Sequence, residues 1–434
     1  MTMERRYRTG DQIWVRERNL AILLNYLWEA GQPVSRTYLV EVSGLNKSTV
    51  GSLLAQLQSW GFVRESGRSG PRPGRPGVLI DLNPDAGRLI GVEIGVGFIS
   101  VVVTDLKAQA IWRQKMETDS QVPLNQVQIL EQAERLVYEA IEATARERHL
   151  FGIGVGVPAL IDHTTGSVLF APNLKWSNVS FRDRWQERFG VPVIVENDAN
   201  AAALGEQMLG VARQVDDFVY LSAGVGLGGG LIIGGKLYGG VGGFAGEVGH
   251  MTLEADGPPC NCGNRGCWET LVGPVAIVQR VRRAAAQGHA PNLLASGEVN
   301  GNVNAIRLEH VLHAAAQGEP AVLDALNEVG RYLGIGIANL VNTFNPSLVV
   351  LGGALSLAGP YVLPRAQAEV NARALAAVRQ GVQITLSAFR FDACVIGGVT
   401  LVLREILGNP TAWRPKPISP PPQPERGGLH HFVQ

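Results

Sequence analysis

The chain has 434 residues, of which 46% are hydrophobic, and its 38 Lys and Arg residues balance 38 Asp and Glu residues. This length exceeds what one core usually serves, and the apolar content excludes a disordered chain, so we expect two or three folded domains. The sequence lacks both a membrane-length apolar run and the hydrophobic core of a secretion signal. We therefore expect a soluble, cytoplasmic protein with no membrane partner.

The charge is distributed unevenly along the chain. Residues 1–80 contain eleven Arg and Lys residues and six acidic residues, a net charge of +5 that the remainder balances with −5. A basic segment on an acidic body predicts that the first 80 residues bind a polyanion.

Residues 17–61 of this basic segment predict three helices. Leucines spaced at i, i+3, i+4 and i+7 predict an amphipathic helix over 17–30. Ser35 caps a second helix that reaches about Val42, and Asn46 caps a third that ends at Gly61. Because a Ser-Gly-Leu turn joins the second and third helices, the pattern is typical of a helix-turn-helix.

Two predicted strands, 62–65 and 77–82, follow the third helix and enclose a basic loop rich in Gly and Pro, 66–76. Such a loop would be the wing of a winged helix, so residues 1–82 are predicted to be a DNA-binding domain. The first turn of the third helix would face the bases and the wing would contact phosphates. The expected DNA-binding residues are Lys47, Ser48, Thr49, Arg68, Arg72 and Arg75. The alternative is a solvated helical hairpin followed by a linker.

The pattern of predicted strands and helices over residues 85–408 indicates a larger α/β domain. Strands are predicted at 89–96, 98–105, 110–117, 151–157, 192–197, 217–223, 228–234 and 347–351, with helices near 124–147 and 397–407. Two similar halves, each opening with strands and a glycine turn, predict a two-lobed fold with a cleft between the lobes. The proline-rich tail 409–434 is expected to be disordered.

Three of the four cysteines cluster with a histidine. A zinc motif over residues 250–267 offers His250, Cys260, Cys262 and Cys267, which complete a tetrahedral set with no open position. The expected zinc is therefore structural, one ion per chain. The alternative is a set of free, reduced thiols, and Cys394 is expected to be a core residue.

These residues belong to a set of motifs that resembles the ROK family of repressors, open reading frames and sugar kinases. The resemblance covers roughly 85–400 and rests on residues 154–158, 173–176, 196–200, 245–250, the Cys-x-Cys-Gly-x-x-Gly-Cys-x-Glu run that ends at Glu269, and 345–353. The repressor branch, which includes regulators that respond to xylose or N-acetylglucosamine, also carries a winged helix at its N-terminus.

The resemblance implies an actin-like, two-lobed ATPase fold and a sugar site. That site would comprise Asn173, Asn197, Asp198, Glu247, His250 and Glu269, whose amides and carboxylates can satisfy sugar hydroxyls. His250 would serve both the zinc and the sugar. In the family's kinases the residue matching Asp198 is the general base, so here it would be a vestigial base. Taken alone, Glu196-Asn197-Asp198 could simply cap a helix.

The nucleotide motifs depart from the family pattern. Family kinases open with Asp-x-Gly-Gly-Thr-Lys, whereas this chain has Glu93 in place of the Asp and Phe98 in place of the Lys. Val225 replaces the Thr of the second phosphate loop. Since each change removes a metal or phosphate contact, we expect no ATP binding and no catalytic residue.

We therefore predict a DNA-binding regulator, a repressor, that binds operator DNA as a homodimer or dimer of dimers and senses a monosaccharide through a kinase-like cleft. One alternative is an active ATP-dependent sugar kinase with a DNA-binding head. Another is a regulator with a vestigial sugar site that a protein partner controls.

Overall fold

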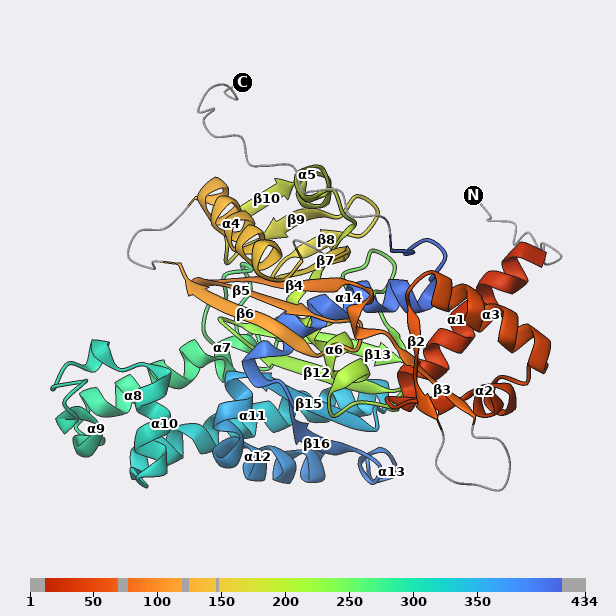
Figure 1. Ribbon diagram of the computed structural model, residues 1–434. Coiled ribbons are helices and arrows are strands. Elements are labelled where there is room, and N and C mark those ends of the chain that lie inside the picture. The colour runs from red at the N-terminus through yellow and green to blue at the C-terminus, as the bar shows by residue number, and fades with distance from the viewer. Residues whose placement is uncertain (1–11, 69–76, 119–124, 146–147, 416–434) are drawn as a thin grey trace, which may run out of the picture.

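The protein consists of a small helical head beside a two-lobed body. The computed structural model describes residues 12–68, 77–118, 125–145 and 148–415 (Figure 1). The head lies at one end of the body, and helices of the second lobe extend from the other end. None of the described helices is both long and apolar enough to span a bilayer.

The head is a winged helix-turn-helix, as predicted. Its elements are α1 (Gln12–Ala30), β1 (Val34–Ser35), α2 (Arg36–Ser43), α3 (Lys47–Ser59), β2 (Val63–Arg68) and β3 (Val78–Leu82), with the strands in the order β1-β3-β2. The Ser35 side chain caps α2 and the Asn46 side chain accepts from Thr49 N at 2.8 Å. Gly44 adopts the left-handed conformation that the turn requires (φ 68°). Helix α1 begins five residues before its predicted start.

The first lobe is built on a five-stranded sheet in the order β11-β7-β4-β5-β6. The strands are β4 (Arg88–Gly95), β5 (Phe98–Thr104), β6 (Ala110–Glu117), β7 (Leu150–Val157) and β11 (Val193–Asn197), and α4 (Gln126–Thr144) packs on them. Strands β4 and β7 are apolar almost throughout because both faces of the sheet are covered.

The segment between β7 and β11, expected to be irregular, contains regular structure. Three short strands, β8 (Leu160–Asp162), β9 (Ser167–Ala171) and β10 (Trp176–Val179), form a second sheet, and α5 (Phe181–Phe189) follows. Each strand of this sheet is only three to five residues long, which is too short for a clear alternation of apolar and polar residues. The aromatic residues Trp176, Phe181 and Trp185 anchor it in the core of the first lobe.

The second lobe has a five-stranded sheet in the order β14-β13-β12-β15-β16. It comprises β12 (Phe218–Ala223), β13 (Leu227–Ile233), β14 (Lys236–Leu237), β15 (Leu348–Gly353) and β16 (Gln383–Leu386), with α11 (Pro320–Phe344) and α12 (Ala354–Arg373) packed together below it. Helices α7 (Glu269–Val272), α8 (Pro274–Ala286), α9 (Pro291–Ala295) and α10 (Leu308–Ala316) form the extension seen in Figure 1.

Two helices fill the space between the lobes, α6 (Asp198–Leu209) and α14 (Ala393–Gly408). They approach so closely that a Cβ on Gly397 would lie 2.0 Å from the Ala201 carbonyl oxygen. Gly398 also lies close to β7, where its own Cβ would meet the Gly154 carbonyl oxygen at 2.6 Å. Helix α14 begins at Ala393 rather than near the predicted residue 397. The small residues at this crossing gave its first turn no clear apolar pattern in the sequence.

The far end of α14 joins the body to the head. Leu403, Ile406 and Leu407 share one hydrophobic core with Leu20, Leu24 and Phe62 of the head. Asn25 of α1 also donates a hydrogen bond to the Leu407 carbonyl oxygen at 3.0 Å. Trp413 packs against the same core, so the predicted disorder of 409–434 is wrong for residues 409–415; residues 416–434 lie outside the described part.

Candidate functional site

A cavity of about 470 Å³ lies between the two lobes. All six residues predicted to bind sugar line it: Asn173, Asn197, Asp198, Glu247, His250 and Glu269. They come from different parts of the chain: the β9–β10 turn, the β11–α6 junction, the 3₁₀ turn η2 (Val248–His250) with the residue before it, and the start of α7. The fold therefore gathers amide, imidazole and carboxylate groups around one cavity.

The strand-to-helix junction at the end of β11 positions the two central side chains. Asn197 Oδ1 accepts hydrogen bonds from Ala199 N at 2.9 Å and Asn200 N at 3.2 Å, so this residue caps α6. Asp198 lines the cavity from the first residue of α6. The capping interpretation and the site interpretation are thus compatible. Burial raises the pKa of Asp198 to about 6.

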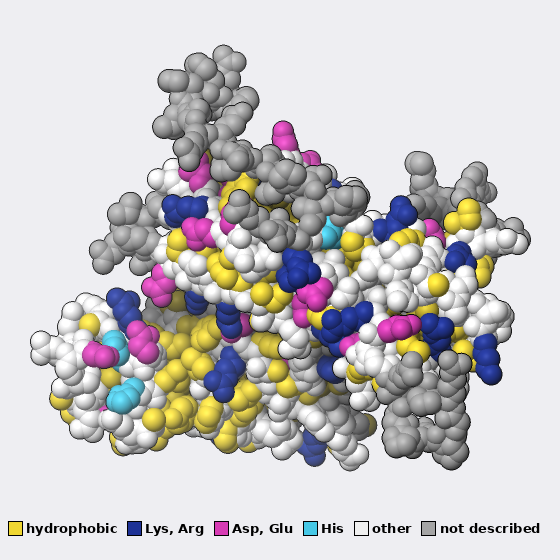
Figure 2. All heavy atoms as spheres, viewed as in Figure 1, with side chains coloured by type: hydrophobic (Ala, Val, Ile, Leu, Met, Phe, Trp, Pro, Cys, Tyr) yellow, Lys and Arg dark blue, Asp and Glu magenta, His cyan; other side chains and the backbone are white. Residues whose placement is uncertain are grey.

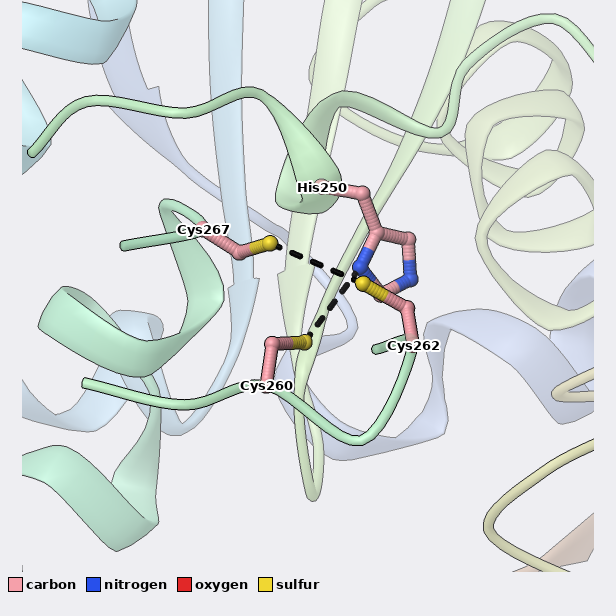
Figure 3. Close-up of side chains that lie close together, drawn as sticks. All are labelled: His250, Cys260, Cys262 and Cys267. Atoms are coloured by element: carbon pink, nitrogen blue, oxygen red, sulfur yellow. Dashed lines mark hydrogen bonds between the residues drawn. The ribbon is translucent and has the colours of Figure 1, made fainter. Parts of the chain in front are cut away.

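The predicted metal ligands converge. The ligand atoms of His250, Cys260, Cys262 and Cys267 all lie within 4.8 Å of one another (Figure 3). Cys262 Sγ and Cys267 Sγ are 3.7 Å apart, as are Cys260 Sγ and His250 Nδ1. A tetrahedral zinc with bonds of about 2.3 Å to sulfur separates its sulfurs by about 3.8 Å. The cluster therefore has both the ligands and the spacing for a metal ion.

The cluster is partly buried and tightly wrapped. Burial raises the pKa of the Cys260 and Cys267 thiols, so a metal ion that binds there would have to displace their protons. Glu269 Oε1 lies 2.8 Å from Cys260 Sγ, which adds an acceptor beside the cluster. The glycine-rich segment wraps tightly, since a Cβ on Gly266 would meet the Glu254 carbonyl oxygen at 1.5 Å.

His250 joins the metal cluster to the cavity. Its Nδ1 faces Cys260, while its Nε2 lies 3.9 Å from Glu247 Oε2 on the cavity side. The two ring nitrogens thus face different groups. A metal held at Nδ1 would fix the orientation of the ring and leave Nε2 for the cavity.

Apolar side chains also line the cavity near the two glycine turns. Phe98 begins β5, Val225 lies in the turn between β12 and β13, and Phe391 lies in the 3₁₀ turn η4 (Arg390–Asp392). Glu93, at the wall, is 9% exposed, and its Oε2 has no hydrogen-bond partner. Burial raises the pKa of Glu93 to about 8.

Several lining residues were not predicted from the sequence. Tyr220 and Ser222, in the strand before the second glycine loop, and Arg390 and Phe391, whose sequence neighbourhood carries no site motif, all line the cavity. Cys394, predicted to be a core residue, is buried and also lines the cavity. Only the packing of α14 between the lobes brings Phe391 and Cys394 to this wall, so no local signal could have found them.

The candidate DNA-binding residues lie on the head. Lys47 and Ser48 are exposed in the first turn of α3, and Thr49 is half-buried. Figure 2 shows further Lys and Arg side chains over the visible face of the head. Arg68 pairs with Val78 in the sheet, while its side chain and the wing residues Arg72 and Arg75 lie outside the described residues.

A helix-turn-helix joined to a two-lobed sugar-kinase fold defines the class of protein to which this chain belongs. Residues 89–405 match the model of the ROK family, and residues 18–67 match that of the IclR helix-turn-helix domain. The chain belongs to the ROK family, and the predicted fold class is confirmed.

Two kinds of relative are found. The xylose repressor of Caldicellulosiruptor bescii is 34% identical over 406 residues, covering 92% of this chain and 99% of that protein. A crystal structure of a ROK family transcriptional regulator, a homologue of the E. coli MLC protein, superposes with a TM-score of 0.75 at 25% identity over 91% of this chain and 97% of that one. A ROK glucokinase from Streptomyces griseus, solved with glucose and AMPPNP, gives a TM-score of 0.65 at 34% identity over 73% of this chain and 99% of that one.

Proposed function

We propose that this protein is a sugar-responsive, DNA-binding transcriptional repressor. The observation that carries the proposal is the presence, in one chain, of a winged helix-turn-helix and a cavity lined by all six polar residues expected for a sugar. The full-length similarity to a xylose repressor supports the same conclusion, because that relative shares the head as well as the body.

The packing offers a route from the sugar to the DNA. Asp198 in the cavity begins α6, which crosses α14 at Gly397, and Cys394 in the cavity wall belongs to α14 itself. The other end of α14 is part of the head's core. A ligand that shifts α6 or the start of α14 would therefore change the position of the head, and so the population competent for operator binding.

The metal of the His250 cluster is proposed to be a structural zinc. Its four ligands leave no vacancy for a substrate. Its contribution would be to hold the segment from Glu247 to Glu269 in the shape that presents three sugar-binding side chains.

We infer that the cleft senses rather than phosphorylates its sugar. Phe98 and Val225 line the cavity at positions where family kinases have polar groups, so contacts that would hold a phosphate are missing there. Asp198, the vestigial base, favours the rival proposal of an active kinase, as does the similarity to a glucokinase. Binding to DNA is proposed to involve two heads of a homodimer, in the cytoplasm where the thiols stay reduced.

Operator binding by the full-length chain tests the proposal. Its affinity for DNA upstream of its own gene should change at least severalfold when glucose, xylose or N-acetylglucosamine is added, and MgATP should not alter that effect. A sugar-dependent release of ADP at an ordinary enzymatic rate, lost in Asp198→Asn, would favour the kinase. Specific DNA binding that ignores every sugar in the panel would favour control by a protein partner.

A further inference from the structure

The cavity between the lobes is larger than a single sugar requires. Its volume is about 470 Å³. A monosaccharide occupies on the order of 200 Å³ at the packing density of protein interiors. A sugar held by Asn197, Asp198 and Glu247 would therefore leave about half of the cavity unfilled.

Apolar side chains in the cavity wall leave part of their surface uncovered. Val225 is 43% exposed and Phe391 is 44% exposed, and both belong to the cavity wall. The Phe98 ring lies over Gly95, where a Cβ would approach it to 2.3 Å, and the Lys115 ammonium covers it at 4.2 Å. Exposed apolar side chains that line a concave site indicate that a ligand covers them.

The cavity wall contains a buried polar group. Glu93 Oε2 is fully enclosed and makes no hydrogen bond, although buried carboxyl oxygens in folded proteins are usually satisfied. Glu93 lines the cavity and lies close enough to Asp198 for their charges to interact. Its raised pKa keeps the carboxyl largely protonated at neutral pH, a form that both donates and accepts hydrogen bonds.

We propose that the effector is a neutral glycoside: a sugar joined through oxygen to a second ring that has an apolar face. The sugar lies among the polar residues, the second ring packs on Phe98, Val225 and Phe391, and Glu93 hydrogen-bonds an oxygen at the junction. This inference rests on the proposed function and specifies its ligand class. A disaccharide and an aryl glycoside share this chemistry.

A phosphorylated sugar fits the same space less well. Among the described residues that line the cavity, Arg390 is the one guanidinium, and it is exposed at the rim. The Asp198 carboxyl lines the same cavity. A phosphate on the sugar would therefore lack buried cationic partners and share the cavity with a carboxylate.

Calorimetry on the full-length, metal-loaded protein tests the proposal. The ligands are glucose, xylose and N-acetylglucosamine, their methyl and phenyl glycosides in both anomeric forms, the disaccharides cellobiose, gentiobiose and xylobiose, and the 6-phosphates of the two hexoses. We expect at least one phenyl glycoside or disaccharide to bind about tenfold or more tightly than its parent sugar and methyl glycoside, because its second ring buries apolar surface. Comparing the phenyl glycosides with the disaccharides shows whether the second ring is an aromatic ring or another sugar.

Variants locate the second ring. Phe391→Ala and Val225→Thr should remove most of the advantage of the second ring and leave the affinity for the parent sugar unchanged. Glu93→Gln should retain binding, and Glu93→Leu should weaken it. Ile111→Ala, which removes an exposed apolar side chain of β6 outside the cavity, is the matched control and should change neither affinity.

Three results would overturn the proposal. The first is a parent sugar that binds as tightly as every two-ring ligand. The second is a sugar phosphate that binds more tightly than any other ligand. The third is an advantage of the second ring that survives Phe391→Ala. In each case the sugar-responsive function would stand, since a sugar or its phosphate still binds. If no ligand of the panel binds, the proposed function fails as well.

Discussion

Two side chains carry most of the chemistry of the cleft. His250 directs Nδ1 toward the cysteine cluster and Nε2 toward the Glu247 carboxylate in the cavity, so a metal at the cluster and a sugar in the cavity would be linked through a single imidazole. Glu93 lies in the cavity wall, where burial rather than a neighbouring charge dominates its ionisation. Each of these two side chains leads to a separate prediction.

The purified protein should contain about one zinc per chain. Cys262→Ser should remove it and lower both the melting temperature and the sugar affinity, because the thiolate set holds the segment that carries Glu247 and Glu269. Elemental analysis and thermal unfolding with and without a chelator measure this. Cys394→Ala, which changes the one cysteine outside the cluster, should keep the zinc. Full metal content in Cys262→Ser would contradict the ligand assignment.

Glu93→Gln should stabilise the protein increasingly as pH rises. The pKa of Glu93 is raised from 4.5 to about 8, so its contribution to stability is present below the lower value and is lost as pH rises through the higher one. At about 1.4 kcal/mol per unit of pKa, the variant gains up to a few kcal/mol by pH 9. Melting temperatures from pH 5 to 9 measure the difference, and the exposed Glu117→Gln is the control. Parallel curves for Glu93→Gln and wild type would show that Glu93 is ionised throughout.

Two helices have functions that differ in kind. Helix α3 presents its first turn to solvent, with Asn46 satisfying the free N–H groups and Lys47 and Ser48 left exposed. Helix α14 is buried along most of its length and runs from the cavity wall to the core of the head. The first would contact DNA, and the second would transmit the state of the cleft.

Lys47→Ala should weaken operator binding and change the preference among operator sequences, because the first turn of α3 is expected to face the bases. Thr49→Ala should change that preference as well. Fluorescence anisotropy with operator DNA over a range of salt concentrations measures both. Lys236→Ala, which removes an exposed cation of β14 in the second lobe, should leave binding intact. Equal losses in Lys47→Ala and Lys236→Ala would indicate a general charge effect.

Gly397→Ala should separate α14 from α6 and reduce the effect of sugar on operator affinity. Its Cβ would lie 2.0 Å from the Ala201 carbonyl oxygen, and overpacking of this kind costs about 1–3 kcal/mol of stability. Gly408→Ala is the matched control in the same helix, because nothing lies within 4 Å of its Cβ position. If Gly397→Ala lost stability but kept a full response to sugar, the α6–α14 crossing would not be the route of communication.

The head and the body share a hydrophobic core instead of being joined by a flexible linker. Leu20, Leu24 and Phe62 pack with Leu403 and Ile406 of α14, and Phe62 stacks on Phe151 of β7 with ring centroids 5.8 Å apart. A head held in this way cannot move independently of α14, which is what a ligand-controlled repressor requires.

The full-length chain should therefore unfold in one cooperative transition. Removal of residues 1–82 should abolish operator binding and lower the melting temperature of the body, because it exposes the apolar end of α14. Calorimetry of the two chains measures this, and a chain that ends at residue 415 is the control, since it keeps every described C-terminal residue. A body that melts at the same temperature without its head would show that the shared core contributes little.

Local sequence patterns were sufficient for much of this protein. The helix caps at Ser35 and Asn46, the long sheet strands and the metal ligands depend on residues near one another in the chain, so spacing alone predicted them. The six sugar-site residues came from motifs whose resemblance covers both lobes. The sheet formed by β8, β9 and β10 was missed because its strands are too short to show a period.

The remaining features depend on contacts between distant segments. Phe391 and Cys394 reach the cavity only because α14 inserts between the lobes, and α14 inserts there because Gly397 and Gly398 allow backbone contact with α6 and β7. Glu93 is protonated because the whole fold buries it. Burial and long-range packing are properties of the assembled chain, so the apolar side chains of the cleft and its connection to the head became visible only in the tertiary structure.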